Sequence, residues 1–337
     1  MIFLRPARKD DVKAVCSLAD KSLIGITTLP KDHHILEQRV LRSCESFAKN
    51  VTKPGNELYL FVAEDAETRS VVGIGGVAAT TGQEGPLYFY RKEFYETDSE
   101  LEKVPKTIPV ITPVSYVHGT SEMCSLFVLP EWRKHGVGTL ASLSRFLFIA
   151  AHPKRFTASL YAELRGIIAS NNTSPFWEGV GKKFFHATFE EALNLLKYGR
   201  NFIPEFLPKY PIYVDLLPRE VTEVIGKPHP ETRRAQEILF AQGFGTTDLI
   251  DIFDGGPKVQ ARRDNVVAIS SSKVSKIKAL EQEIEPLVHA IVTNERLDFR
   301  ACFAPIRIGA KGYVTLGKQT AEVLEVSLND AVRIYIL

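Results

Sequence analysis

Hydrophobic positions in the first eighty residues follow two spacings, which predict a strand, a helix and a β-hairpin in that order. Residues 2–5 form a short apolar run that ends at a proline. The acidic pair Asp10 and Asp11 then precedes apolar residues at helical spacing, and acidic side chains suit the amino-terminal end of a helix. Residues 58–63 and 71–79 are rich in β-branched and apolar residues with a polar turn between them, as in a hairpin.

The regular pattern is lost at residues 82–119 and returns immediately afterwards. This segment is rich in proline, tyrosine and charge, so we expect a long irregular excursion, whose length is typical of a functional loop. Residues 121–129 are mostly apolar and are followed by a proline, which predicts a buried strand. Apolar residues at 139–150 recur at helical spacing. A strand, a glycine-containing loop and a helix of three or more turns are therefore expected in succession.

The rest of the chain continues to alternate strands and helices. The expected elements are a strand at 159–166, a helix at 175–185, a strand at 213–217, a helix at 232–242 followed by Gly243, a strand at 249–253, a helix at 273–292 and a small β module that includes 314–316 and 331–337. The succession of helix, glycine, phenylalanine and strand occurs twice, at 176–185 and 235–244, which hints at two related lobes. The predicted fold is α+β with a mixed sheet, divided into residues 1–200, 201–270 and 271–337.

Composition describes an ordinary globular protein. The chain has 337 residues, of which 45% are hydrophobic and 24% charged, enough for two folded domains. Lys and Arg number 42 against 40 Asp and Glu, so the charge balance gives no reason to expect a nucleic-acid or membrane partner. The amino terminus has no long apolar region of the kind found in signal peptides, which favours a cytoplasmic protein.

Cysteine and histidine spacing does not predict a metal site. The four cysteines are scattered without CxxC spacing, so we expect neither zinc nor a disulfide framework. His33, His34 and His118 have no Cys or carboxylate partner at ligand spacing, so we assign them to the surface or to loops. Four phenylalanines, Phe146, Phe148, Phe184 and Phe185, are interpreted as core.

The strongest chemical motif is the run from Arg133 to Gly138, with sequence RKHGVG, between the buried strand and the helix. Such a loop presents successive backbone N–H groups at a helix amino terminus, where the helix dipole favours an anion. A Cβ at Gly136 or Gly138 would hold a phosphate away from the backbone, and Arg133 adds a bidentate donor. The motif alone also fits a tight strand-to-helix turn.

Two other phosphate-binding loops fit the same residues poorly. A Walker A loop needs Gly-Lys-Ser/Thr, whereas Gly138 is followed by Thr139 and Leu140. A dinucleotide fingerprint needs a parallel βαβ unit and an acidic residue after the next strand, and neither is expected here. The remaining class is the Arg-x-x-Gly-x-Gly loop that binds the pyrophosphate of coenzyme A.

Several further segments give the chain a family resemblance. They are Ser121 to Phe127 with Trp132 to Lys134, Ala162 to Gly166, Ser174 to Trp177, Gly226 to Pro230, and Ile250 to Pro257. With these segments the chain resembles, from end to end, the arginine N-succinyltransferase family of the GNAT-like acyltransferase superfamily. The resemblance implies two GNAT-like lobes with a small carboxy-terminal β module.

The resemblance also implies an activity, which is transfer of a succinyl group from succinyl-CoA to the α-amine of L-arginine, giving N2-succinyl-L-arginine and CoA. It places the succinyl-CoA contact at Leu126 and the proton donor at His229. Succinyl-CoA is then a co-substrate, and no metal is implied. Some relatives also act on ornithine, and some pair with a paralogous subunit, so either a homo-oligomer or such a pair is implied.

The chemistry of amine acylation suggests roles for further residues. The ammonium must lose a proton and the leaving thiolate must gain one, and a histidine can do either. Backbone N–H groups from Leu126 to Val128 could stabilise the oxyanion. A guanidinium substrate calls for carboxylates, for which Glu163, Asp251 and Asp254 at strand ends are candidates.

Arg165 could hold the succinyl carboxylate. Each of these residues also has a structural interpretation: His229 as an exposed loop residue, Leu126 to Val128 as core, and the carboxylates as turn or cap residues. Two other functions stay open, an N-acyltransferase for ornithine or another amine, and a non-catalytic CoA-binding subunit.

Overall fold

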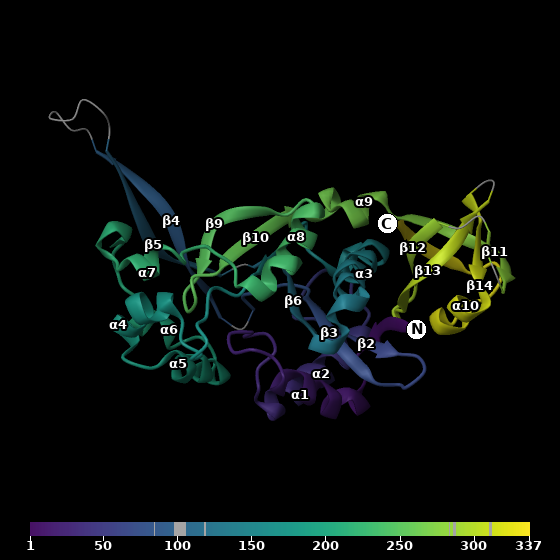
Figure 1. Ribbon diagram of the computed structural model, residues 1–337, viewed down its shortest axis with the longest axis horizontal. Helices are drawn as coiled ribbons and strands as arrows, with labels where there is room; N and C mark the ends of the chain where they lie inside the picture. The colour runs from purple at the N-terminus through teal and green to yellow at the C-terminus, as the bar shows by residue number, and fades with distance from the viewer. Residues whose placement is uncertain (84, 98–105, 118, 283, 286–287, 310–311) are drawn as a thin grey trace.

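Strands of one mixed β-sheet form the frame of the molecule, and helices lie against both of its faces (Figure 1). The computed structural model describes residues 1–83, 85–97, 106–117, 119–282, 284–285, 288–309 and 312–337. The strands are β1 (Ile2–Pro6), β2 (Leu58–Asp65), β3 (Val71–Ala78), β4 (Leu87–Thr97), β5 (Lys106–Tyr116), β6 (Ser121–Val128), β7 (Ser159–Glu163), β8 (Ile212–Tyr213), β9 (Gly245–Asp251), β10 (Pro257–Arg262), β11 (Lys273–Glu281), β12 (Val288–Asn294), β13 (Ala301–Ile308), β14 (Val314–Gly317) and β15 (Ala331–Ile336).

The helices are α1 (Val12–Asp20), α2 (His33–Ala48), α3 (Val137–Ala151), α4 (Lys182–Phe185), α5 (Phe189–Leu195), α6 (Ile203–Phe206), α7 (Arg219–Thr222), α8 (Arg233–Ala241), α9 (Val267–Ser271) and α10 (Lys318–Leu324). No helix of the described residues has both the length and the apolar character needed to cross a membrane.

Strand order places the two chain halves in one sheet. Neighbouring strands follow the order β12-β15-β11-β14-β13-β1-β2-β3-β6-β7-β10-β9-β4-β5-β8. β12 also pairs with β13, so strands β11 to β15 close into a small barrel at the right of Figure 1. β9 and β10 lie between β7 and β4, so strands from both sides of residue 200 are interleaved. The division into lobes at residue 200 stays a prediction.

Alternation along the central strands builds a separate core on each face of the sheet. In β2, Tyr59 and Phe61 pack in the core that contains α3, whereas Leu60 and Val62 pack with α1 and α2 on the opposite face. The period of two in strands requires this arrangement when both faces are covered. A third core, which includes Trp177, unites the segment carrying α4 to α7 with β9.

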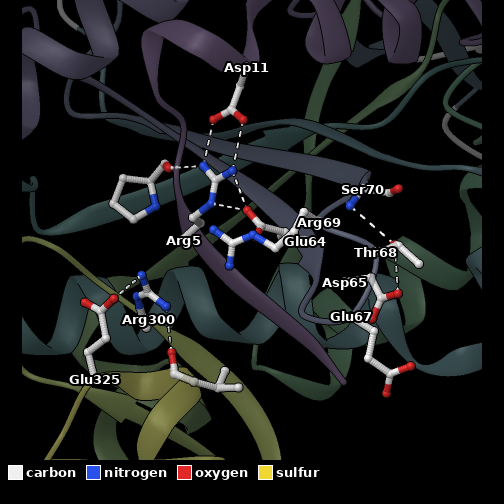
Figure 2. Close-up of polar contacts among 12 residues, drawn as sticks. Arg5, Asp11, Glu64, Asp65, Glu67, Thr68, Arg69, Ser70, Arg300 and Glu325 are labelled. Carbon is white, nitrogen blue, oxygen red and sulfur yellow. Dashed lines mark hydrogen bonds and ion pairs between the residues drawn. The ribbon is translucent and has the colours of Figure 1, made fainter.

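A compensated ion cluster fixes the start of the chain (Figure 2). The buried guanidinium of Arg5 donates to both oxygens of Asp11, at 2.7 and 2.9 Å, and to Glu64 at 2.5 Å. Arg69 Nε lies 3.0 Å from the other oxygen of Glu64. The Arg300 guanidinium, 2.6 Å from Glu325, also lies over the ring of Phe3 and so links β1 to the barrel.

The prediction of an irregular loop over residues 82–119 is wrong, because β4 and β5 form a long hairpin there. The prolines that suggested irregularity lie in β5, where Pro109 and Pro113 stand an even number of positions apart. Their missing N–H groups therefore fall on one edge of the strand, and β5 is nearly at the edge of the sheet, paired with β8 only at Val110 and Ile111. His118 lies outside the described residues.

The helix predicted over residues 273–292 is also wrong, since β11 and β12 occupy this segment. Lys, Glu, Leu and Ala give it a helical composition, but burial alternates: Ile277 is buried between the exposed Lys276 and Lys278. Pairing with β14 and β15 completes the barrel, so tertiary contacts override helix propensity. The predicted β segments at 314–316 and 331–337 are confirmed as β14 and β15.

Smaller differences concern element boundaries. Of the strand predicted at 213–217 only Tyr213 is in β8, and a 3₁₀ turn follows at Val214–Leu216. The strand predicted at 249–253 starts earlier and ends at Asp251. The α2 helix was not predicted, although Asp32 caps it by accepting from two backbone N–H groups.

Phe184 is 36% exposed, unlike the other three phenylalanines assigned to the core. The mixed α+β fold class is confirmed.

Candidate functional site

A β-bulge in β6 marks the start of the site. The register between β3 and β6 shifts between Ile74 and Gly76, and Ser125 has a left-handed φ of +54°. This conformation is costly for a residue other than glycine and needs support from its surroundings. Thr28 supplies that support, because its side-chain oxygen accepts from the Ser125 N–H at 3.0 Å and its carbonyl accepts from the Ser125 hydroxyl at 2.7 Å.

β6 and β7 separate directly after their first residues, and a cavity occupies the gap. The two parallel strands are paired only at Ser121 with Leu160 and at Glu122 with Tyr161. The cavity is lined by Gly25, Ile26, Thr27, Thr28, Glu122, Met123, Cys124, Ser125, Leu126, Ser142, Arg145, Ala162, Glu163, Leu164, Arg165, Phe189, Leu193, Thr232, Ala235, Leu239, Asp251, Phe253 and Asp254. Splayed strands thus open a pocket inside an otherwise continuous sheet.

The glycine run lies between β6 and α3, as predicted. Residues Pro130–His135 form a 3₁₀ turn, and Gly136, at φ +76°, starts α3 without a capping side chain. Gly136 is required by its left-handed φ and by the ring of Phe303, 3.2 Å from where a Cβ would stand. At Gly138 a Cβ would meet only Val128, at 4.0 Å, so packing does not require glycine there. A group from outside the protein can therefore approach the backbone at this position.

Arg133 stands at the surface of this loop. Its Nε donates to the Val128 carbonyl at 3.1 Å, and its Nη1 donates to Glu231 at 3.0 Å. Glu231 belongs to the turn before α8, so the pair joins the loop to the segment that carries His229. Of the predicted coenzyme contacts, Leu126 lines the cavity, whereas Val128 is buried in β6 and does not.

His229 lies beside the cavity rather than in its lining. Its backbone N–H donates to the Arg165 carbonyl at 2.7 Å, and its Nδ1 accepts from the Glu231 N–H at 3.2 Å. Thr232, the last residue of the following turn Pro230–Thr232, does line the cavity. Desolvation, reinforced by the Arg165 charge, lowers the pKa of His229, although Glu231 and the Ile168 backbone act in the opposite direction. Since Nδ1 accepts, the neutral ring carries its proton on Nε2.

The predicted carboxylates Glu163, Asp251 and Asp254 converge in the cavity wall, together with Glu122, which the sequence analysis missed. Burial is the largest cause that raises the pKa of each, and the other carboxylates raise it further in Glu163 and Asp254. The pKa of Glu163 reaches about 8. Asp254 is buried, whereas Glu122, Glu163 and Asp251 are half-buried, and all four line the cavity.

Hydrogen bonds divide these carboxylates into two kinds. Asp251 accepts from the N–H groups of Phe253 and Asp254, at 2.7 and 2.9 Å, and Asp254 accepts from Gly256 at 2.8 Å. These two therefore also have the turn-forming role that aspartate often plays. Among the described residues none donates a hydrogen bond to the Glu163 carboxylate, which is left to interact with a ligand.

Two arginines supply positive charge to the same cavity. Arg165 is 8% exposed, and its Nη1 donates to the Ile24 carbonyl at 3.0 Å. Its Nε is buried without a hydrogen-bond partner among the described residues, which is costly unless a ligand completes it. Arg145 was missed by the sequence analysis; it donates to the carbonyls of Ala141, Gly76 and Cys124 and has no carboxylate partner among the described residues.

A signal for the missed residues exists in the sequence. Glu122 is a charge inside the mostly apolar strand Ser121–Val128, and Arg145 interrupts the apolar face of α3. Buried charges in such positions are rare unless they are paired or bind a ligand. The described residues contain no group of side chains suited to hold a metal ion.

Comparisons with known proteins match the whole chain. A family model described as arginine N-succinyltransferase beta subunit matches residues 2–268, and a model of the carboxy-terminal domain of that subunit matches residues 273–335. The arginine N-succinyltransferase of Enterobacter sp. (strain 638) is 35% identical over 99% of this chain and 97% of its own length. That of Yersinia enterocolitica is 36% identical with the same coverage of both chains.

A solved structure agrees with these relatives. Arginine/ornithine succinyltransferase subunit AI from Pseudomonas aeruginosa has a TM-score of 0.90 and 34% identity, and the similarity covers 100% of this chain and 98% of the other. The boundary between the two family models, at residues 268–273, falls in front of the barrel strands β11 to β15.

Proposed function

The chain belongs to the arginine N-succinyltransferase family and is an acyltransferase that moves a succinyl group to arginine; we propose that the cavity between β6 and β7 is where the two substrates meet. The observation that carries this proposal is the charge of the cavity. Four carboxylates line it against two arginines, Arg145 and Arg165, and burial raises the pKa of each carboxylate. A cationic substrate would supply the missing charge.

Glu163, Asp251 and Asp254 bind the cationic groups of L-arginine in this proposal. Carboxylates are the natural partners of a guanidinium, and a low-polarity cavity strengthens such pairs. Asp251 and Asp254 are held in place by backbone N–H groups and so present fixed acceptors, whereas Glu163 is free to follow the substrate. Discrimination between arginine and shorter amines such as ornithine depends on the depth of this acidic wall.

Succinyl-CoA approaches from the β6–α3 side. Its pyrophosphate binds at the uncapped amino terminus of α3, where Gly136 and Gly138 expose backbone N–H groups and Arg133 adds charge. The thioester lies near Leu126, and backbone N–H groups from Leu126 to Val128 stabilise the oxyanion. Arg165 holds the succinyl carboxylate, because it lines the cavity and its Nε has no hydrogen-bond partner among the described residues.

His229 acts on the proton of the leaving group. A lowered pKa keeps the ring neutral at pH 7 with its proton on Nε2, so it donates that proton to the leaving thiolate and recovers one from the nitrogen of the tetrahedral intermediate. The C–S bond breaks as the sulfur is protonated. Its position beside Arg165, at the mouth of the splayed strands, supports this assignment.

A thiol-release assay tests the reaction. Purified chain with succinyl-CoA is expected to release CoA only when L-arginine is present, and no arginine-dependent release from the chain alone would contradict catalysis by this chain. A matrix of succinyl- and acetyl-CoA against arginine and ornithine separates the alternative acceptors and donors. Ornithine is the second candidate acceptor, because the Pseudomonas relative is named for both amino acids.

One substitution tests the role of His229 beside the cavity, and a second serves as its control. His229→Ala should lower kcat by about 10²–10⁴-fold with CoA binding retained, as expected for a general acid–base residue. A non-catalytic CoA-binding subunit would bind CoA unchanged and turn over nothing in either form. Arg219→Ala, which breaks an exposed i,i+4 pair with Glu223, serves as a control and should leave turnover unchanged.

A further inference from the structure

Glu122 and Glu163 face each other from neighbouring strands on one side of the sheet. Glu122 is paired with Tyr161 in the parallel β6–β7 ladder, and Glu163 is two residues beyond Tyr161. Residues at i and i+2 of a strand, and residues directly opposite across strands, project to the same face. The two carboxylates therefore lie together where the strands begin to separate, and both line the cavity.

Lys258 occupies the third side of this arrangement. It is directly opposite Glu163 in the antiparallel β7–β10 ladder and is only 8% exposed. Its ammonium lies 4.1 Å from the ring centroid of Tyr161 and 4.3 Å from that of Phe89, a cage of two aromatic faces. Cation–π contacts hold such an ammonium without neutralising it. Burial lowers the pKa of Lys258, whereas the charges of Glu163 and Glu122 act in the opposite direction, so the ammonium and the carboxylate pair favour each other's ionised forms.

Resting on the proposed function, we propose that the Glu122–Glu163 pair accepts the proton of the substrate's α-ammonium group, and that Lys258 is a positioning residue that keeps one of the two carboxylates ionised. Glu122 raises the pKa of Glu163, and two carboxylates that interact in a desolvated site tend to hold one proton between them unless a cation offsets the second charge. Lys258 provides that offset from a fixed place, so the pair can take up a proton when the ammonium arrives.

The proton and electron pairs balance in this scheme. An N–H bond of the ammonium breaks and an O–H bond forms on the carboxylate pair, which leaves a free amine. The amine lone pair forms the C–N bond to the thioester carbon, and the C–S bond breaks. The second proton on nitrogen reaches the thiolate sulfur through His229. The carboxyl proton then passes to solvent, so that one proton is released per turnover.

Other charged groups around the pair set its titration as well. Those that act on Glu122, Glu163 or Lys258 are Arg39 from α2, Arg200 from the segment before α6, Tyr161 from β7, and Asp248 and Asp251 from β9. Arg39 and Arg200 favour the ionised carboxylates, and Asp251 opposes ionisation of Glu163. Burial, the first cause, raises the pKa of Glu163 to about 8, near the range in which an amine must be deprotonated.

The test follows kcat/KM for arginine against pH at saturating succinyl-CoA, for the full chain. Removing a nearby positive charge raises a carboxylate pKa, so Lys258→Met should move the acidic limb of the profile to higher pH by about one unit. Lys258→Arg should restore the limb towards the wild-type position, because it keeps the charge. Lys278→Met is the matched control, since Lys278 lies over the ring of Tyr313 in the barrel, and its profile should equal that of the wild type.

A second set of variants tests the pair itself. Glu163→Gln should lower kcat by about 10²–10⁴-fold with CoA affinity retained. The loss should be smaller with arginine methyl ester, whose α-ammonium is more acidic and needs a base less. A merely structural role for Glu163 predicts the same loss for both substrates.

The outcomes separate this inference from the proposed function. Arginine-dependent CoA release by the wild type, together with an unmoved acidic limb in both Lys258 variants, overturns the role of Lys258. Wild-type turnover in Glu163→Gln and in Glu122→Gln overturns the proton acceptor. Absence of any release by the wild type overturns the proposed function instead. Thermal unfolding of each variant identifies a folding defect. If one of the two glutamate variants has such a defect, the comparison of arginine with its methyl ester is made in the other.

Discussion

Two buried ion clusters in this protein use the same residue types and titrate in opposite directions. At the start of the chain Arg5 bonds to Asp11, and its hydrogen bonds and charge hold the pKa of that carboxyl below its usual range despite burial (Figure 2). In the cavity burial raises the pKa of Glu163, the charges of Glu122 and Asp251 raise it further, and no described residue donates a hydrogen bond to the carboxylate. Burial alone is therefore no sign of function, whereas burial without compensation is.

The difference follows from where the cations stand. The Arg5 guanidinium makes a two-pronged contact with Asp11 and also reaches Glu64, so one cation serves both acids at bonding distance. In the cavity Lys258 is held by aromatic rings instead, and Arg165 bonds to a backbone carbonyl. The first cluster is complete without a ligand, and the second is completed by one.

The largest expected effect breaks the compensated cluster. Arg5→Met should lower the free energy of unfolding by about 3–5 kcal/mol, since it leaves the buried Asp11 without its cation and Glu64 with only the exposed Arg69. Urea unfolding at pH 7 measures this loss. Because the folded pKa of Asp11 is lowered, its stabilisation in the wild type is present above about pH 4 and is lost as pH falls through the folded pKa. An unchanged unfolding midpoint in Arg5→Met would show that the two clusters do not differ as described.

The same experiment on the cavity should have the opposite sign. Glu163→Gln should stabilise the fold at about pH 8 by about 1 kcal/mol or more, because it removes a buried charge that lacks compensation. An acid with a raised folded pKa binds more protons when folded, so its destabilising effect grows as pH rises from about 4.3 to about 8. The gain should therefore vanish below about pH 4. A destabilised Glu163→Gln at the alkaline end of this range would assign Glu163 to structure.

The smallest expected effect on stability compares the exposed Arg69 with the buried Arg5 in the compensated cluster. Arg69 also contacts Glu64, but its side chain is 64% exposed. Arg69→Ala should change the free energy of unfolding by less than about 1 kcal/mol, as exposed pairs generally do, with the measurement repeated at high salt. A loss as large as that of Arg5→Met would mean that the exposed arginine, not the buried one, compensates Glu64.

The sequence by itself determined the elements whose hydrophobic pattern matches the secondary structure that they adopt in the fold. The hairpin of β2 and β3, the buried strand β6 and the helix α3 were predicted because alternation, apolar spacing and the glycine run depend on nearby residues. Glu163, Asp251 and Asp254 were predicted as substrate-binding residues because carboxylates at strand ends are visible without tertiary information, and this role stays a prediction. The family, too, was identified from short segments spread along the whole chain.

Only the tertiary structure decided which distant residues meet and what their charges do. Segments near residues 122, 163 and 251 form one acidic wall because β6, β7 and β9 join one sheet, and strand pairing is not encoded in local periodicity. The β11 strand was mistaken for a helix for the same reason, since the barrel supplies its partners. Protonation likewise depends on burial and on neighbours such as Lys258, so the contrast between the two ion clusters exists only in the folded molecule.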